Sequence, residues 1–146
     1  MDTIRKLYKD VPKINNIAPT ICTLKQRGII VVLASITWSF FVGLFAADFG
    51  FDSYCGTSMK IRNDTLSGEI ESYCTERDKL QFFINICQNL NISKSDTIAI
   101  GDSRSDHPIF RDAGKSVALN ADIETRKLAT YSINTQNLLD ILPFFE

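Results

Sequence analysis

The chain has 146 residues, enough for one domain with a buried core, and its 45% hydrophobic and 23% charged residues are typical of a globular protein. Its formal net charge of −1 gives no electrostatic reason to expect a nucleic acid or an anionic membrane surface as partner. We therefore expect a single domain over residues 1–146 that binds neither.

The chain is predicted to begin with two helices and a strand. Residues 1–16 are mixed and polar, and they contain a short helix that Pro12 ends. A second helix is expected over 18–26, because Gly28 stands where a helix end favours a left-handed residue. The apolar run 29–34 follows as a buried parallel strand.

Residues 28–47 contain no charged side chain, and about 20 apolar residues is the length of a membrane span. By hydropathy alone, a span and a buried strand followed by a buried helix are both possible. Ser35, Thr37 and Ser39 lie together in the middle of the segment, and no signal-peptide pattern precedes it. With the motifs described below, these hydroxyls favour a strand followed by a helix over 38–49, and no membrane association is expected.

Alternating side chains over 54–73 predict a β-hairpin that turns around Arg62-Asn63-Asp64. Helical and strand patterns then alternate to the end of the chain. The predicted helices are 79–90, 108–113, 123–129 and 136–142, and the predicted strands are 97–100, 116–119 and 131–133. This alternation predicts an α/β fold, a three-layer open parallel sheet with a β-hairpin insertion.

The four cysteines are not spaced as CxxC, and the one histidine lies far from them in sequence, so no zinc site is expected. Cys55 and Cys74 flank the hairpin, so a disulfide between them stays open, although an α/β domain of this size needs no such bond. We expect reduced thiols and a cytoplasmic protein.

Two carboxylates, Asp102 and Asp106, follow the predicted strand 97–100. Ligands of open α/β sheets bind beyond the carboxyl ends of the strands, and paired carboxylates there can hold Mg²⁺. A polar loop in which Ser105 or Asp106 caps the next helix would explain the same residues without a ligand.

Two further polar residues could bind phosphate. Ser35 ends a strand, where its hydroxyl and the following N–H groups suit phosphate oxygens, or where it could simply cap a helix. Lys79 opens a helix and could neutralise a phosphoryl group, although most lysines are only solvated. His107 adjoins Asp106, but a lone histidine is more often a surface residue, and we assign it no role.

In chain order, Ser35, Lys79 and the pair Asp102 and Asp106 resemble motifs two, three and four of the haloacid dehalogenase (HAD) superfamily. The similarity spans about residues 17–142 and is greatest to the phosphoserine-phosphatase-like branch. The segments that carry it include Leu66-Ser67-Gly68-Glu69, Asp78-Lys79 and Gly101-Asp102-Ser103-Arg104-Ser105-Asp106-His107-Pro108-Ile109-Phe110.

The resemblance implies a Rossmann-like HAD core and a Mg²⁺-dependent phosphomonoester hydrolase that acts on a small phosphorylated metabolite. Asp102 would bind the Mg²⁺ ion, and Asp106 would support the metal site or its waters. In such enzymes an aspartate attacks phosphorus, and a second aspartate two residues later acts as general acid and base.

The resemblance also implies a phosphate site. Ser35 and the N–H of Ile36 would bind the phosphoryl oxygens, and Ser105 would contact the phosphate or its surroundings. Lys79 would offset the charge of the phosphoaspartate and of the transition state. Side chains at Ser35-Ile36-Thr37 replace the glycines usual in the branch, which narrows the space beside the phosphate and argues against phosphoserine itself as substrate.

Motif one, Asp-x-Asp-x-(Thr/Val), is not found, since Asp2-Thr3-Ile4 lacks the second aspartate. We therefore expect the central, nucleophile-bearing strand and most of the cap to be absent, with residues 1–16 a remnant of the cap. Two neighbouring strands would then have unpaired edges.

Whether this chain is an enzyme stays open at this point. One hypothesis is a phosphatase that is inactive or incomplete as the chain stands. A second is a non-catalytic pseudophosphatase or binding module that pairs with another polypeptide, which would supply the missing strand. A third is a small membrane protein anchored by residues 28–47.

Overall fold

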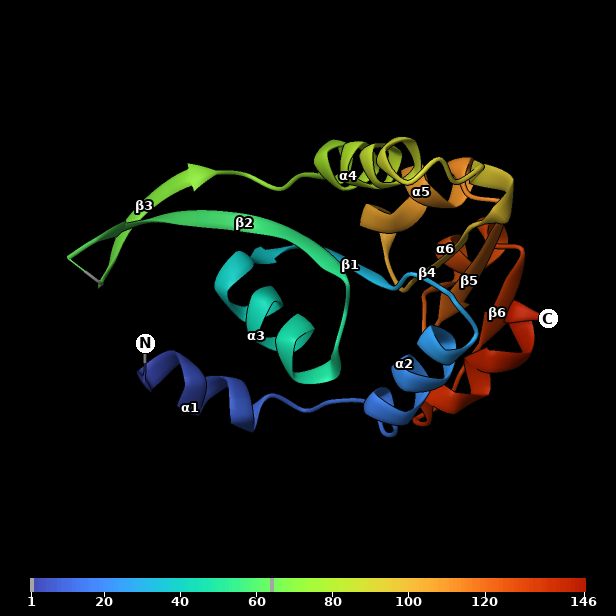
Figure 1. Cartoon of the computed structure of the whole chain (residues 1–146), viewed down its shortest axis with the longest axis horizontal. Coiled ribbons are helices and arrows are strands. Elements are labelled where there is room, and N and C mark those ends of the chain that lie inside the picture. Colours follow the sequence, from blue (N-terminus) through green and yellow to red (C-terminus); the bar gives the residue numbers. More distant parts are fainter. Residues whose placement is uncertain (1, 64) are drawn as a thin grey trace. The chain divides into compact units, whose positions relative to one another are not determined.

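The computed structural model describes residues 2–63 and 65–146, so Asp64 of the predicted hairpin turn lies outside the described residues. The chain forms two compact units, one ending at Cys74 and the other running from Thr75 to Glu146. Each is described by itself, with the labels of Figure 1.

The first unit combines helices with a three-stranded sheet in the order β1-β2-β3. Strands β1 and β2 are parallel and β2 and β3 antiparallel, so a crossover through α3 is followed by the predicted hairpin. Its elements are α1 (Asp2–Asp10), α2 (Ile17–Gln26), β1 (Val32–Trp38), α3 (Ser39–Phe49), β2 (Ser53–Arg62) and β3 (Thr65–Ser72). Gly28 has the left-handed backbone predicted for it, with φ 75°.

The first strand begins later than predicted and ends at Trp38, where a helix was expected to begin, so the predicted bounds 29–34 are wrong. Strand pairing starts at Val32. Just before it, the Asp52 carboxylate accepts a hydrogen bond from the N–H of Val31 at 2.8 Å and forms an ion pair with Lys25 at 2.7 Å. Burial would raise the pKa of Asp52, but these two partners outweigh it and lower that pKa below its ordinary value.

The end of β1 is irregular. Ala34 pairs with Cys55 and Trp38 with Thr57, so a longer stretch of β1 faces a shorter stretch of β2. Bulges of this kind re-aim side chains at the end of a strand. Gly56 permits the close approach, because a Cβ atom there would lie 2.9 Å from the carbonyl oxygen of Thr37.

The uncharged segment 28–47 is divided between β1 and the 11-residue helix α3. Apart from Ser39 and Asp48 helix α3 is apolar, and it contacts α1, α2, β1 and β2, as expected for a helix covered on several sides. Within the described part of the chain, none of the helices has the length and apolar character needed to cross a membrane.

The second unit contains a three-stranded parallel sheet in the order β4-β5-β6 (Figure 1). Its helices and strands are α4 (Glu76–Asn89), β4 (Ile98–Gly101), α5 (His107–Asp112), β5 (Lys115–Leu119), α6 (Ile123–Leu128) and β6 (Tyr131–Ile133). Phe110, Ala118 and Ala121 form its buried core, where α5 and α6 pack on the sheet. The predicted α/β fold with parallel strands is confirmed.

The last predicted helix has a different type and position. Residues Leu138–Phe145 form a 3₁₀ helix, where an α-helix over 136–142 was predicted. Asn137 accepts a hydrogen bond from the N–H of Leu139, which starts the helix later. Pro143 lies inside it and has no N–H to continue an α-helical ladder.

Each sheet ends in a parallel strand that is paired on one side. In the described residues, β1 pairs with β2 and β4 pairs with β5, and neither has a second strand neighbour. The predicted absence of a central strand between neighbours with unpaired edges stays a prediction.

Tyr8 provides a test of the packing of α1. Its side chain is 7% exposed, and burial, reinforced by the nearby Asp48 carboxylate, raises its pKa to about 12. Because an unfolded tyrosine titrates near pH ~10, the folded state holds the proton more tightly. The resulting stability is fully present below that pH and is lost as the pH rises toward 12.

We expect Tyr8→Phe to lose less stability than the wild type when the pH is raised across that window. Urea unfolding, followed by circular dichroism at neutral and at alkaline pH, measures the difference. Tyr73→Phe is the control, since Tyr73 is 69% exposed. Equal alkaline losses in wild type and Tyr8→Phe would contradict the expectation.

Candidate functional site

Lys79 is positioned by the first turn of α4. The helix begins with a capping box, in which the Thr75 hydroxyl accepts from the N–H of Asp78 at 3.3 Å and the Asp78 carboxylate accepts from the N–H of Thr75 at 2.8 Å. The hydrogen bond from the Thr75 hydroxyl is the largest influence that lowers the pKa of Asp78. The predicted helix start at 79 was therefore three residues late, although the Thr75-x-x-Asp78 pattern signals the cap.

The Lys79 side chain is buried and paired. Its residue is 3% exposed, and its Nζ donates to the Oδ1 of Asp106 at 2.5 Å and to the Oγ of Ser105 at 3.0 Å. A buried ammonium requires such partners, because an unpaired charge away from water is costly. The structure thus brings Lys79 together with Ser105 and Asp106, which the sequence selected from a different segment.

Asp106 also organises the loop that follows β4. Its Oδ2 accepts from the N–H of Asp102 at 3.1 Å and from the N–H of Ser103 at 3.3 Å, and Ser103 forms a capping box with it. Gly101 lies so close that a Cβ atom there would overlap the Asp106 carboxylate. Ser103 was not selected from the sequence, although the Ser103-x-x-Asp106 spacing is a capping signal.

The two predicted metal ligands have different environments. Asp102 is exposed at the carboxyl end of β4, whereas both oxygens of Asp106 accept hydrogen bonds. In residues 2–63 and 65–146 no group of three or more His, Cys, Asp or Glu side chains could hold a metal. Mg²⁺ commonly takes one or two protein carboxylates and completes its shell with water and phosphate oxygens. Asp102 fits that role, and Mg²⁺ binding by this pair stays a prediction.

Ser35 and Ile36 belong to the other compact unit. The Oγ of Ser35 accepts from the N–H of Thr37 at 3.2 Å, and the carbonyl of Ile36 accepts from the Thr57 hydroxyl at 2.9 Å. Ser35 is not a helix cap, since the residue that precedes α3 is Trp38. It shapes the irregular end of β1 instead. Its predicted phosphate contact, and that of Ile36, stay predictions.

His107 has a structural partner. Its Nε2 lies 2.9 Å from the hydroxyl of Thr125, which is fully buried and whose N–H donates to the carboxylate of Asp122. This contact joins the start of α5 to the start of α6. It accounts for the histidine without a catalytic role.

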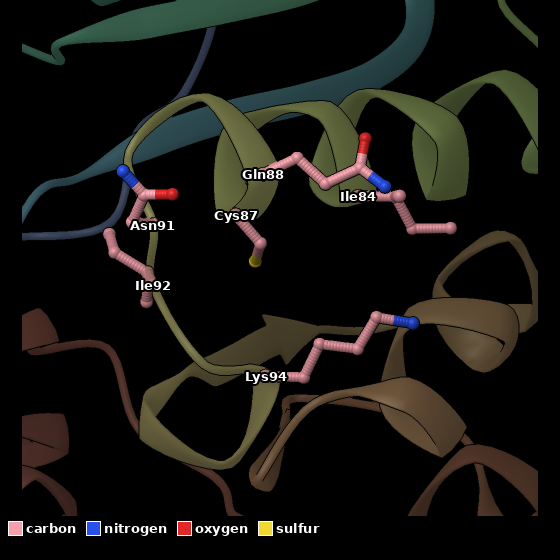
Figure 2. Close-up of a pocket in the computed structure, with 6 residues that line it drawn as sticks. All are labelled: Ile84, Cys87, Gln88, Asn91, Ile92 and Lys94. Carbon is pink, nitrogen blue, oxygen red and sulfur yellow. The ribbon is translucent and has the colours of Figure 1, made fainter.

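A depression of about 400 Å³ lies at the carboxyl-terminal end of α4. Figure 2 shows the Cys87 thiol directed from the helix toward the space beside the Lys94 side chain. Lys94 forms an ion pair with Asp112, and burial raises the pKa of Cys87. None of the predicted phosphate- or metal-binding residues lines this depression, which is formed by Ile84, Cys87, Gln88, Asn91, Ile92 and Lys94.

Comparison with known proteins supports the hydrolase family that the fold and the motifs indicate. Residues 2–111 match the model of the haloacid dehalogenase-like hydrolase family. The chain therefore belongs to this family. Its relatives and structural neighbours show that it is a phosphoserine-phosphatase-like member.

Two curated relatives named phosphoserine phosphatase illustrate the match. The protein of Albidiferax ferrireducens is 28% identical over 98% of this chain and 63% of its own length. That of Methanocaldococcus jannaschii is 24% identical over 100% of this chain and 70% of its own length. A crystal structure of apo phosphoserine phosphatase superimposes with a TM-score of 0.89 at 25% identity, over 99% of this chain and 73% of that one. The chain thus spans part of the length of these proteins.

The ion pair of Lys79 and Asp106 can be tested through stability. We expect Lys79→Met to lower the free energy of unfolding by about 3 kcal/mol, because a carboxylate remains without its buried partner. Urea denaturation followed by circular dichroism measures the change.

Lys127→Met is the matched control. Lys127 is paired with Glu124 at 2.9 Å, but its side chain is 67% exposed, and exposed pairs contribute under about 1 kcal/mol. If the two variants lost the same small amount, the Lys79 pair would not support the fold.

Proposed function

We propose that this chain carries the motif two, three and four residues of a Mg²⁺-dependent phosphomonoester hydrolase that acts on a small phosphorylated metabolite. The observation that supports it most is the buried Lys79, held by Asp106 and Ser105 in the loop at the carboxyl end of β4. In open parallel sheets this end of the strands is where ligands bind.

Lys79 would stabilise negative charge on the transferred phosphoryl group. The Lys79 ammonium has three N–H donors. In the described residues two of them are used, one by Asp106 and one by Ser105. A third donor is then available for a phosphate oxygen. Since the pair with Asp106 fixes the side chain before the substrate arrives, little reorganisation is needed during the reaction.

Asp102 would hold the metal ion, because its carboxylate is exposed beside this loop while that of Asp106 is engaged. A bound Mg²⁺ would supply positive charge for the phosphoryl oxygens. Asp106 would act indirectly. Its carboxylate accepts a hydrogen bond from the N–H of Asp102, which fixes the backbone that presents the Asp102 carboxylate.

Ser35 and the N–H of Ile36 would bind phosphoryl oxygens at the end of β1. The Ile36 side chain is 52% exposed, so it is not packed away in the core. An isoleucine there restricts the space around the phosphate, so we infer a substrate other than phosphoserine, although the relatives are named for phosphoserine.

The chemistry requires a nucleophile and a general acid that these residues do not provide. No two aspartates in the sequence are separated by a single residue. We therefore propose that the chain as given is catalytically incomplete. A segment bearing Asp-x-Asp-x-Thr, from the same or another polypeptide, would supply both groups.

The test is hydrolysis of p-nitrophenyl phosphate with Mg²⁺. We expect no turnover from the chain alone, and turnover after a strand-forming segment with Asp-x-Asp-x-Thr is fused to its amino terminus. Asp102→Asn should abolish that activity, because it removes the carboxylate assigned to Mg²⁺. Asp96→Asn, which changes an exposed aspartate just before β4, should leave it intact. A fusion that is folded by circular dichroism but inactive would overturn the proposal.

A second candidate function is binding of another polypeptide by strand addition. The observation that favours it is the open edge of β4, whose residues are all only partly buried. An unpaired strand edge is a template for another extended segment. On this proposal the chain is a non-catalytic module, and its partner contributes an apolar parallel strand.

Strand addition predicts protection of β4. A peptide with an apolar strand sequence should slow hydrogen exchange of the amides in Ile98–Gly101, because they become covered by the new strand. A peptide of the same composition with proline at its centre should not, since proline cannot complete the ladder. Unchanged exchange at saturating peptide would exclude this function.

A further inference from the structure

Two cysteines lie together at the base of the β2–β3 hairpin. The Sγ of Cys74 is 3.8 Å from the Sγ of Cys55, which is thiol-to-sulfur contact distance. Cys55 lies on β2 and pairs with Ala34 of β1, and Cys74 follows β3 as the last residue of the first compact unit. Both sulfurs therefore belong to one unit.

Neighbouring hydrogen bonds hold the pair in place. The N–H of Cys74 donates to the hydroxyl of Thr57 at 3.0 Å, and that buried hydroxyl donates to the carbonyl of Ile36 at 2.9 Å. The backbone on both sides is thus fixed, and a disulfide requires the two sulfurs to approach by about 2 Å. Rotation of the side chains supplies a movement of that size.

The four cysteines differ in what they can react with. Cys74 is 7% exposed and Cys55 is partly buried, so Cys55 is the member of the pair that a small oxidant reaches. Cys22 is exposed on α2, and Cys87 is buried on α4. In the described residues, Cys55 and Cys74 are the two whose sulfurs are in contact.

We propose that Cys55 and Cys74 form a reversible disulfide when the protein meets a peroxide. The Cys55 sulfur attacks the O–O bond of hydrogen peroxide, becomes a sulfenic acid and releases one water. The Cys74 thiol then attacks the Cys55 sulfur, the S–S bond forms, and the sulfenic oxygen leaves as a second water. The two thiols together lose two protons and two electrons, and the peroxide takes up both and is reduced to two waters. A dithiol reductant reverses the bond by exchange.

The disulfide would restrain the end of strand β3, which Cys74 follows. It closes the chain between residues 55 and 74, and Thr75, the cap of α4, follows directly. Oxidation therefore limits the freedom of the unfolded chain and of the hairpin base. This inference does not depend on the proposed phosphatase activity.

Peptide mapping of the folded, full chain tests the proposal. Reduced protein is treated with hydrogen peroxide, its remaining thiols are alkylated, and it is digested with trypsin without reductant. Cleavage after Arg27, Lys60, Arg62 and Arg77 gives peptides 28–60 and 63–77, each with one cysteine. We expect these two peptides to be joined, with a mass lower by two hydrogens than their sum, and to separate with dithiothreitol.

Two variants complete the test. Cys22→Ser with Cys87→Ser should still give the joined peptide, and its midpoint of thermal unfolding should rise on oxidation and return on reduction. Cys55→Ser should show neither effect. Separate alkylation or sulfinic acid at Cys55 and Cys74 in the oxidised native protein would overturn the proposal. A cross-link that forms only after denaturation would also overturn it.

Discussion

The buried ion pair between Lys79 and Asp106 is the interaction on which the second unit depends. Lys79 is almost fully buried, so its charge is tolerated only because the Asp106 carboxylate lies 2.5 Å away. Asp106 in turn accepts from the backbone of Asp102 and Ser103. One carboxylate thereby joins the first turn of α4 to the loop after β4. The same hydrogen bonds therefore stabilise the second unit and fix the loop of its candidate site.

Two residues of the candidate site lie on or next to end strands of the sheets. The family match covers residues 2–111, which include Ser35, Lys79, Asp102 and Asp106. In the described residues the end strands of the two sheets are β1, β3, β4 and β6. Of these, β1 carries Ser35, and β4 precedes Asp102. Paired strands would ordinarily cover such edges. Pairing of a nucleophile-bearing strand with β1 or β4 stays a prediction.

Much of the fold could be predicted because periodicity and turn residues are local signals. The hairpin, the strand at Tyr131–Ile133 and the left-handed Gly28 all followed from such patterns. The extent of β1 could not, since its start depends on Asp52 and its irregular end on the close approach at Gly56. Both partners lie about twenty residues farther along the chain, where no local pattern indicates the contact.

The candidate site divides in the same way. The order of Ser35, Lys79, Asp102 and Asp106 in the sequence was sufficient to suggest the family and the type of residue each position needs. The different environments of the two aspartates did not follow from the sequence, because the hydrogen bonds that Asp106 makes with Lys79 and Ser103 depend on the folded chain, whereas Asp102 stays exposed.

The sequence by itself determined the α/β class, the family and the residues that bear charge, because these follow from local pattern and residue chemistry. Only the tertiary structure decided which charges are paired, which strand edges are open and which two of the four thiols meet. Those properties depend on distances between residues far apart in the chain, and folding alone sets such distances.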